Sequence, residues 1–274
     1  DNLISAGRRL YYEFSFDYDR KFGDHKVTAL ALVNRQVIED KVGGQNTMEF
    51  PAYTEDWVGR VTYNWKERYL TEVNMSYTGS EKFAPGQRFG FFPSLSVGWN
   101  IYQEPFLEKI REKFLSNFKV RYSYGKTGSD FGAPRFNYIQ LYNSSGNVAF
   151  GNSQNVNFGP LYTEGRTANP FSTWEVALKQ NLGVEIGLWK KLDFTLDLFD
   201  ERRKGILMTP RTTASWFGAG LPSLNIGETK NHGLELSLGW NDRLGDGFRY
   251  WSNFNFAWSE NRIVNRDDPA DLLK

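Results

Sequence analysis

Apolar and polar residues alternate strictly through most of the chain. In residues 192–202, LDFTLDLFDER, polar and apolar side chains take turns as Asp193, Phe194, Thr195, Leu196, Asp197 and Leu198. Successive side chains of a β-strand point to opposite faces of its sheet, so such a segment has one polar and one apolar face. The alternation therefore predicts a two-faced strand here.

The same alternation recurs elsewhere and predicts an all-β chain of about ten strands. The other segments are 9–19, 25–33, 57–65, 69–79, 93–101, 118–128, 176–189, 233–240 and 248–258. Strands in globular proteins average about five or six residues. These segments run to about 9–13, the length that a tilted strand needs to cross a bilayer. The lengths favour a transmembrane antiparallel β-barrel over a soluble sheet, which stays an alternative.

Aromatic side chains support the membrane interpretation. They make up 16% of the chain, although its mean hydropathy is −0.55. Amphipathic rings gather where a membrane protein crosses the interface between lipid and water. Several of these rings fall near the ends of predicted strands, namely Trp57, Trp65, Tyr69, Tyr77 and Trp99.

Short and long connections alternate between the predicted strands. The short ones lie near 19–24, 65–68, 189–193 and 243–247, and the longer ones span 34–56, 79–90, 127–174 and 203–228. Outer-membrane barrels have this arrangement, with brief periplasmic turns and extended extracellular loops. The connector 104–117 is the exception, because its sequence EPFLEKIREKFLSN has a helical pattern.

The connector predicts one short periplasmic helix. Pro105 suits its first turn, and one helical face would carry Phe106, Leu107, Ile110, Phe114 and Leu115. Such a face suits a cap on the barrel rim, and docking of a partner helix is the alternative.

Composition excludes several classes of protein. Lys and Arg total 33 against 32 Asp and Glu, so net charge gives no general attraction for nucleic acid. The chain has no cysteine, which excludes disulfides and thiolate chemistry, and His25 and His232 cannot form a His-rich metal site alone. No apolar run is long enough for a transmembrane helix. The sequence lacks a signal segment and ends in NRDDPADLLK, which indicates a piece of a longer chain.

The chain carries no convincing catalytic, cofactor or metal motif. Asp193 and Asp197 share a strand face and lie about 13 Å apart at about 3.3 Å per residue. Glycosidase carboxylates lie at most about 9.5 Å apart, so this pair on one strand is not expected to be catalytic. The segment YGKTG resembles a phosphate loop, but Val120 stands where that motif needs glycine.

Residues 136–163 contain no charged side chain and are rich in Asn, Ser, Gly and rings. A near-repeat, NVAFG at 147 and NVNFG at 155, indicates an extracellular hairpin. Amides and flat rings suit uncharged polar ligands such as sugars or peptides, and packing against other loops or a partner protein is the alternative. The candidate contact residues, with one from the 203–228 loop, are Tyr138, Tyr142, Phe150, Phe158, Tyr162 and Trp216.

Several longer segments resemble the barrel of the SusC/RagA family of TonB-linked outer-membrane transporters of Bacteroidetes. They are 56–69, 69–101 (with RFGFFPSLSVGW), 119–130, 174–189, 192–207 and 224–240. The resemblance implies a barrel of roughly 22 strands that encloses a plug. Residues 1–274 would be part of the C-terminal half of that barrel, without the plug domain or the TonB box.

The resemblance also implies a location and partners. The location is the bacterial outer membrane, and the partners are a SusD-like surface lipoprotein and the TonB complex, which acts through parts absent here. The substrate would be a glycan or a peptide, and no cofactor is implied. Two other hypotheses remain: a complete ten-stranded outer-membrane barrel enzyme with carboxylates or a histidine on its rim, and a soluble carbohydrate-binding sheet protein.

The residues of the family motif are expected to be structural. They are Arg88, Phe89, Gly90, Phe91, Phe92, Pro93 and Trp99. Pro93 lacks a ladder donor and should lie at a strand start or an edge-like irregularity, and Gly90 permits a close approach. We expect Arg88 and the three Phe rings to anchor the strand at the outer interface. Asp193, Thr195 and Asp197 are expected to face the lumen.

Overall fold

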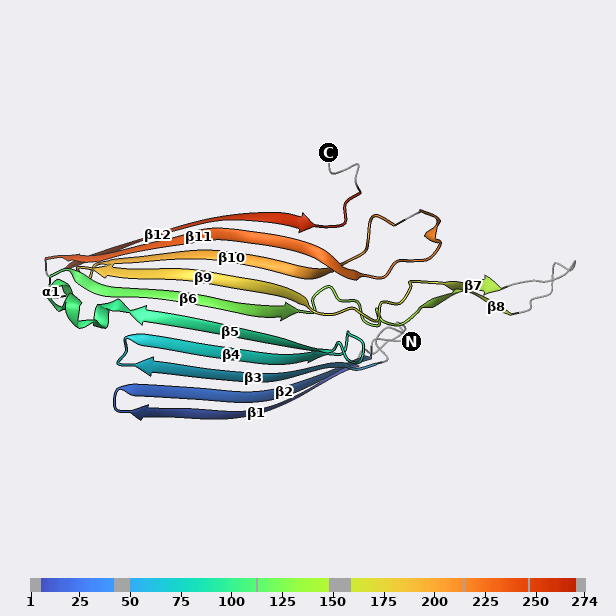
Figure 1. The fold of residues 1–274 in the computed structure, drawn as a ribbon, viewed down its shortest axis with the longest axis horizontal. Coiled ribbons are helices and arrows are strands. Elements are labelled where there is room, and N and C mark those ends of the chain that lie inside the picture. The colour runs from blue at the N-terminus through green and yellow to red at the C-terminus, as the bar shows by residue number, and fades with distance from the viewer. Residues whose placement is uncertain are drawn as a thin grey trace, which may run out of the picture.

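The computed structural model describes residues 6–41, 50–111, 113–147, 159–213, 215–245 and 247–269. Within these ranges, ten strands form one antiparallel sheet in the order β1-β2-β3-β4-β5-β6-β9-β10-β11-β12 (Figure 1). The strands of this sheet are β1 (Ala6–Phe22), β2 (His25–Lys41), β3 (Ala52–Trp65), β4 (Tyr69–Ser80), β5 (Phe89–Asn100), β6 (Leu115–Ser129), β9 (Glu175–Leu188), β10 (Leu192–Met208), β11 (Leu224–Leu244) and β12 (Phe248–Asn265).

The remaining elements lie in the connections. A separate hairpin of β7 (Tyr142–Asn147) and β8 (Pro160–Glu164) extends from the long connection between β6 and β9 (Figure 1). The helical pieces are η2 (Ile101–Gln103), η3 (Pro105–Leu107), α1 (Glu108–Arg111) and η4 (Ser215–Phe217). All ten predicted segments fall on the strands of the sheet, so the predicted fold class is confirmed. No helix in the described ranges is long and apolar enough to cross a membrane.

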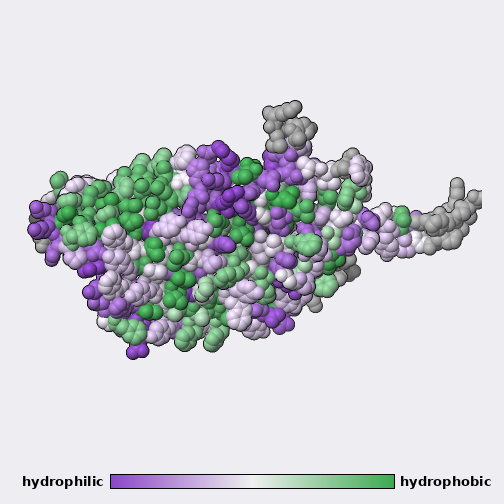
Figure 2. Space-filling model, in the orientation of Figure 1, coloured by the Kyte–Doolittle hydropathy of each residue, from purple (hydrophilic) through white to green (hydrophobic). Residues whose placement is uncertain are grey.

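The strand registers place polar residues opposite polar ones and apolar residues opposite apolar ones on neighbouring strands. Asp197 of β10 lies opposite Gly183 of β9 and Glu235 of β11, so the polar parities of the three strands share one face. Large apolar side chains occupy the other face, and many are exposed, such as Phe14 at 73%. Figure 2 shows apolar side chains gathered over the turn-side half of β11 and β12. An exposed apolar surface on this scale fits a sheet that faces lipid.

All short turns lie at one end of the sheet and all long connections at the other (Figure 1). Two of the turns use left-handed backbone at both central residues. These are Lys66 and Glu67, with φ of 53° and 57°, and Trp189 and Lys190, with φ of 55° and 57°. This geometry matches the twist of a two-residue hairpin turn. The predicted tight turns after β3 and β9 are therefore confirmed.

The strands extend further toward the long connections than the sequence pattern predicts. Their lengths in the sheet reach 21 residues, in β11. The expected loop 34–56 is wrong, because β2 and β3 stay paired from Asn34↔Asp56 to Ile38↔Ala52. The expected loop 203–228 is also too long, since β10 continues to Met208 and β11 begins at Leu224. In these extensions apolar and polar residues no longer alternate, although the backbone hydrogen bonds continue.

The connector between β5 and β6 does not form the expected amphipathic helix. Its only α-helical segment, within the part of the chain described, is α1, four residues long. Phe106 is 68% exposed, while Leu115 is buried and already belongs to β6. The predicted common face of five apolar residues is therefore wrong. Two 3₁₀ turns instead lead the chain across to β6.

Glu104 attaches this connector to the aromatic residues at the turn end of the sheet. Its side chain is 7% exposed and accepts hydrogen bonds from Tyr69 Oη at 2.8 Å and Trp99 Nε1 at 3.0 Å. Arg68 Nη1 lies 3.6 Å from the same carboxylate. The hydrogen bonds from Trp99 and Tyr69 and the charge of Arg68 hold the pKa of Glu104 below its ordinary value, against the opposing effect of burial. Trp99 is thereby fixed at the interface end of β5.

The lowered pKa of Glu104 predicts a pH-dependent stability. Because the folded-state pKa is depressed, the carboxylate stabilises the fold above its ordinary pKa of about 4.3, and this stabilisation is lost as pH falls through the lowered pKa. Wild type should therefore unfold at a higher temperature than Glu104→Gln at neutral pH. The difference should shrink progressively as pH falls below about 4.3. A difference that stays constant with pH in thermal unfolding would contradict this account.

Candidate functional site

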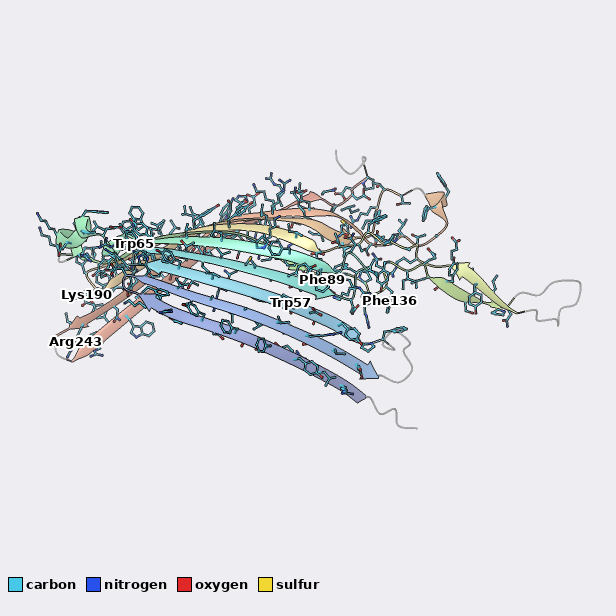
Figure 3. All side chains as sticks on the ribbon, turned by 60° about the horizontal axis from the view of Figure 1, so that its bottom comes forward. Trp57, Trp65, Phe89, Phe136, Lys190 and Arg243 are labelled. Carbon is cyan, nitrogen blue, oxygen red and sulfur yellow. The ribbon has the colours of Figure 1, made fainter. Side chains whose placement is uncertain are left out.

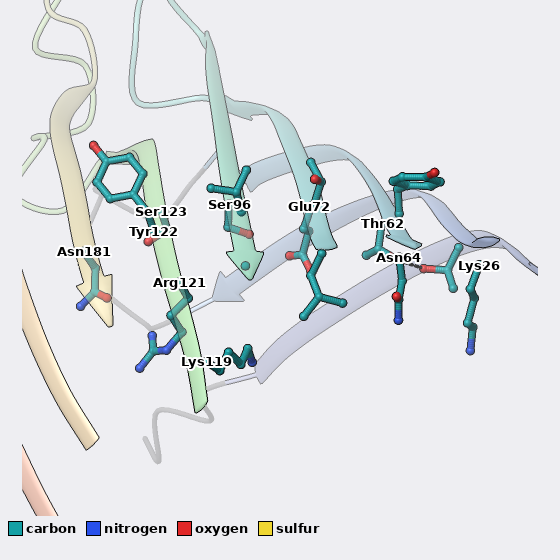
Figure 4. A pocket seen from close by; sticks show the side chains of 16 residues that line it. Lys26, Thr62, Asn64, Glu72, Ser96, Lys119, Arg121, Tyr122, Ser123 and Asn181 are labelled. Carbon is teal, nitrogen blue, oxygen red and sulfur yellow. Dashed lines mark hydrogen bonds between the residues drawn. The ribbon is translucent and has the colours of Figure 1, made fainter. Parts of the chain in front are cut away.

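The polar face of the sheet is concave over its turn-side half. A hollow of about 500 Å³ is lined there by residues from β2 to β6 and from β9 (Figure 4). Its labelled lining side chains are Lys26, Thr62, Asn64, Glu72, Ser96, Lys119, Arg121, Tyr122, Ser123 and Asn181. Hydroxyl, amide and charged groups from six strands thus form one continuous wet surface.

Arg121 joins three strands on this polar face. From β6 it reaches across β9, where its Nε lies 3.1 Å from Glu185 Oε1, to β10, where its Nη2 lies 2.8 Å from Asp197 Oδ2. Gly183 makes this path possible, because a Cβ there would come within 2.6 Å of Arg121 Nε. The sequence pattern did not predict this network. The residue types were visible, but only the register shows that Gly183 lies between the charges.

The three polar residues of the 192–202 segment have different surroundings. Asp197 is mostly buried and neutralised by Arg121, whereas Asp193 is exposed. Thr195 lies opposite Glu185 on the same face. No group of three or more His, Asp or Glu side chains in the described ranges could hold a metal ion. The arrangement suits a structural ion pair in a wall, because the arginine charge stabilises the ionised carboxylate.

A compact cluster supports the long-connection end of the same face. Phe83 is fully buried and packs with Phe92 and Trp174, which are 9% and 8% exposed. The Phe92 ring fills the space over two glycines, since a Cβ on Gly90 or Gly128 would come within 2.3 Å or 1.9 Å of its Cζ. These glycines therefore permit the close approach that the sequence predicted for Gly90.

The structure separates the motif residues that were expected to share the outer interface. Phe89 and Phe91 lie on the apolar face and are exposed, but Phe92 lies on the other face, inside the cluster. Arg88 also points inward, where its Nε donates to the carbonyl of Phe83 at 3.2 Å. The common interface role is therefore wrong for Phe92 and Arg88, because strand alternation sends them to the opposite side.

Pro93 occupies an edge-like position inside β5. The β5 residues up to Pro93 pair only with β4, and pairing with β6 begins at Ser94. Proline has no N–H to donate, so it fits a place where the second neighbouring strand is absent. This agrees with the predicted edge-like irregularity.

The β7–β8 hairpin presents two of the candidate rings together. Tyr142 pairs with Glu164 and Ser144 with Tyr162, so the two tyrosines are diagonal neighbours on one face of the hairpin. They are 63% and 61% exposed. Phe150 and Phe158 lie outside the described residues. Both strands of the hairpin lie within the charge-free segment 136–163, apart from the last residue of β8, Glu164.

The other two candidate rings lie nearer the sheet. Tyr138 is partly buried beside Phe136, with ring centroids 6.4 Å apart. Trp216 lies in η4, between β10 and β11, and is 86% exposed. The structure therefore does not bring all candidate rings into one contact surface. Tyr142 with Tyr162, and separately Trp216, remain available to a ligand or a partner.

Asparagine side chains join the two longest connections. Asn137 and Asn169 both donate to the carbonyl of Ser223, at 2.9 Å and 2.8 Å. Asn225 donates to the carbonyls of Thr173 and Gly205, at 2.8 Å and 2.7 Å. The hairpin and the loop that carries Trp216 are thus attached to the same buried amide network. The sequence showed only that asparagine is abundant here.

Long antiparallel strands with one apolar face, tight turns at one end and long loops at the other define a wall segment of an outer-membrane barrel. The family model described as "TonB dependent receptor-like, beta-barrel" matches residues 2–272. The chain belongs to this family. Its location is the bacterial outer membrane.

The chain is similar to receptors of two bacteria and to several solved structures. TonB-dependent receptor P3 of Formosa agariphila is 27% identical in an alignment of 281 positions that covers 93% of this chain. TonB-dependent receptor SusC of Bacteroides thetaiotaomicron is 27% identical over 212 residues, or 76% of this chain and 20% of SusC. The RagAB peptide importer in its closed-closed state superimposes with a TM-score of 0.76 at 18% identity, over 94% of this chain and 30% of that one.

The chain spans 27% of the length of TonB-dependent receptor P3. The structural likeness to the RagAB importer supports the barrel fold at an identity too low to carry function. The family match thus identifies this chain as part of the barrel wall.

Removal of the Phe92 ring should destabilise the barrel. Phe92→Ala leaves a cavity over Gly90 and Gly128 and should lower the free energy of unfolding by about 3–5 kcal/mol. Phe91→Ala, one residue away on the apolar face, is the matched control. Lipid can fill the space it leaves, so its cost should stay below about 2 kcal/mol. Equilibrium unfolding of the full-length receptor in detergent measures both, and equal losses would contradict the assignment of faces.

The Arg121 network should be measurable as coupling between strands. Arg121→Gln leaves Asp197 without its partner and should cost about 1–3 kcal/mol of stability. Lys119→Gln removes a cation from the same strand and face, where no ion pair is described, and should change stability by less than about 0.5 kcal/mol. A double-mutant cycle with Asp197→Asn should return a coupling of about 1 kcal/mol. Zero coupling would show that the contact contributes nothing.

Proposed function

We propose that this chain is part of the barrel wall of a TonB-dependent importer that brings glycan oligosaccharides or peptides across the outer membrane. The observation that carries the proposal is the family match over residues 2–272 on a sheet with one apolar and one polar face. The polar face, including Asp193, Thr195 and Asp197, would line the lumen around a plug. SusC, which is a TonB-dependent receptor, supports the class of protein, and the RagAB structure, titled a peptide importer, has the same fold.

The proposed importer works with partners that act through other parts of the protein. A SusD-like surface lipoprotein would cover the extracellular loops, and the TonB complex would act on a plug that precedes the barrel. Residues 1–274 would contribute only barrel wall. The exposed rings of the long connections, Tyr142, Tyr162 and Trp216, face the side where ligand and lipoprotein arrive.

An uncharged polar substrate fits the loop chemistry. The 136–163 segment offers amides, hydroxyls and rings without a charge. Rings stack on the flat faces of sugars or peptide groups, while amides form hydrogen bonds that fix orientation.

The proposed chain is a transporter segment and does not catalyse a reaction. Asp193 and Asp197 are too far apart along one strand for an acid pair, and Arg121 neutralises Asp197. Catalysis would need groups that converge on a substrate, whereas Asp197 is paired with Arg121 from another strand and Asp193 is an exposed residue of the wall. Their role would be to shape and stabilise the wall.

Uptake by the full-length receptor, expressed with its lipoprotein, tests the loop assignment. Tyr142→Ala and Tyr162→Ala should each lower uptake of labelled neutral oligosaccharides or peptides about fivefold, because each removes a stacking ring. Asp193→Asn should stay within about twofold of wild type, because it removes only an exposed wall charge.

Two outcomes would overturn parts of the proposal. If Asp193→Asn alone abolished uptake while both tyrosine variants were silent, the loop assignment would be wrong. If no lipoprotein co-purified with the receptor, the proposed lidded pair would fail. Comparison of oligosaccharide uptake with peptide uptake then identifies the substrate class.

A further inference from the structure

A second hollow, of about 310 Å³, lies at the long-connection ends of β2 to β5. Arg35, Tyr53, Glu55 and Phe89 are among its lining residues. The registers pair Arg35 with Glu55, and both share the strand parity of Trp57 on the apolar face. This hollow therefore opens toward the lipid side of the wall, opposite to the face that carries Arg121.

Aromatic rings make one wall of this hollow apolar. The Phe89 ring lies across Gly79, where a Cβ would come within 2.6 Å of Phe89 Cε1. The same ring stacks on Tyr77, with centroids 4.8 Å apart. Trp57 lies two residues below Glu55 on β3 and is half exposed; Figure 3 shows Trp57 and Phe89 at the same end of the sheet. These rings form the upper end of the apolar band.

Arg35 brings a positive charge to the hollow. It is exposed, its guanidinium carbon lies 5.7 Å from the Tyr53 ring centroid, and it forms no ion pair with a carboxylate in the described ranges. Outward-facing cations on β10 and β11 differ, because Arg202 is paired with Glu228 and Lys230 with Asp200. The Glu55 carboxylate accepts a hydrogen bond from Trp57 Nε1 at 2.8 Å. Arg35 thus keeps its hydrogen-bond donors free for a ligand.

The height of the hollow places it at the lipid headgroups. Glu55 and Tyr53 lie two and four residues beyond Trp57, or about 7–13 Å along the strand at about 3.3 Å per residue. For a strand tilted by about 45°, this is about 5–9 Å along the membrane normal. Tryptophan marks the edge of the hydrocarbon layer, and the headgroup region beyond that edge is about 5–8 Å thick. A guanidinium at this level meets the charged groups of the outer leaflet.

We propose that this hollow binds the anionic headgroup of an outer-leaflet glycolipid. Arg35 donates hydrogen bonds to a headgroup phosphate, and the rings of Tyr53 and Phe89 contact the adjoining sugar and acyl chain. The other arginine of the lining, Arg88, is bonded inward to the carbonyl of Phe83, which leaves Arg35 as the unpaired cation. A lipid fits better than a free anion, because one unpaired cation beside an apolar wall gains affinity only if the ligand also has apolar surface. The site would fix this part of the barrel in the bilayer, independently of any imported substrate.

Native mass spectrometry of the full-length receptor in detergent, titrated with monophosphoryl lipid A, tests the site. Arg35→Gln should weaken binding about tenfold, the value of one charged hydrogen bond. Glu55→Gln keeps an acceptor for Trp57 Nε1 and removes a negative charge that repels the headgroup phosphate. This variant should therefore bind the lipid more tightly than wild type. Arg202→Gln removes an arginine of the same outward face that is paired with Glu228, and it should change affinity less than twofold. Gel migration without heating checks that each variant is folded.

Three results would overturn the proposal. The first is an affinity of Arg35→Gln equal to that of wild type or of Arg202→Gln. The second is equal binding of dephosphorylated lipid A, which would remove the role of the phosphate. The third is complete displacement of the lipid by inorganic phosphate, which would show a site for free anions. None of these measurements depends on uptake, so failure here leaves the proposed import function untouched.

Discussion

A continuous backbone ladder is the constraint on which this structure depends. A lipid environment offers no hydrogen-bond partners, so every peptide group in a spanning strand must pair with a neighbouring strand. Ten strands pair in sequence order, with β1 and β12 at the edges of the described sheet and β7 and β8 set apart outside it. Because the ladder fixes the register, it also fixes which side chains face lipid and which face water.

Because of that register, the two faces of the sheet make different kinds of contact. The polar face brings Arg121, Glu185 and Asp197 together from three strands and lets Phe92 pack against Trp174. Aromatic rings border the apolar face at the turn end and at the long-connection end of the strands. At the turn end, Glu104 accepts hydrogen bonds from Trp99 and Tyr69. Glycines such as Gly183 lie where a side chain must cross a neighbouring strand. The wall is thus held by a few specific contacts added to the ladder.

The alternation in segments such as 192–202 predicted the strands, their faces and the side of the short turns. It failed beyond the apolar band, where residues 34–38 stay in a strand although apolar and polar residues no longer alternate. It also failed for the connector, because local apolar spacing could not show that Leu115 begins β6. The partners of Arg121 and the inward direction of Phe92 depend on register and on loops far away in sequence. Only the three-dimensional structure supplies those.

The most direct test of the wall measures lipid and water contact along residues 193–198 in the full-length receptor. Single cysteines at these positions, carrying spin labels, report collision with oxygen in lipid and with a water-soluble nickel reagent. We expect a period of two, with oxygen contact at positions 194, 196 and 198 and low oxygen contact at 193, 195 and 197. Absence of this period, or the opposite parity, would contradict the account of a two-faced membrane wall.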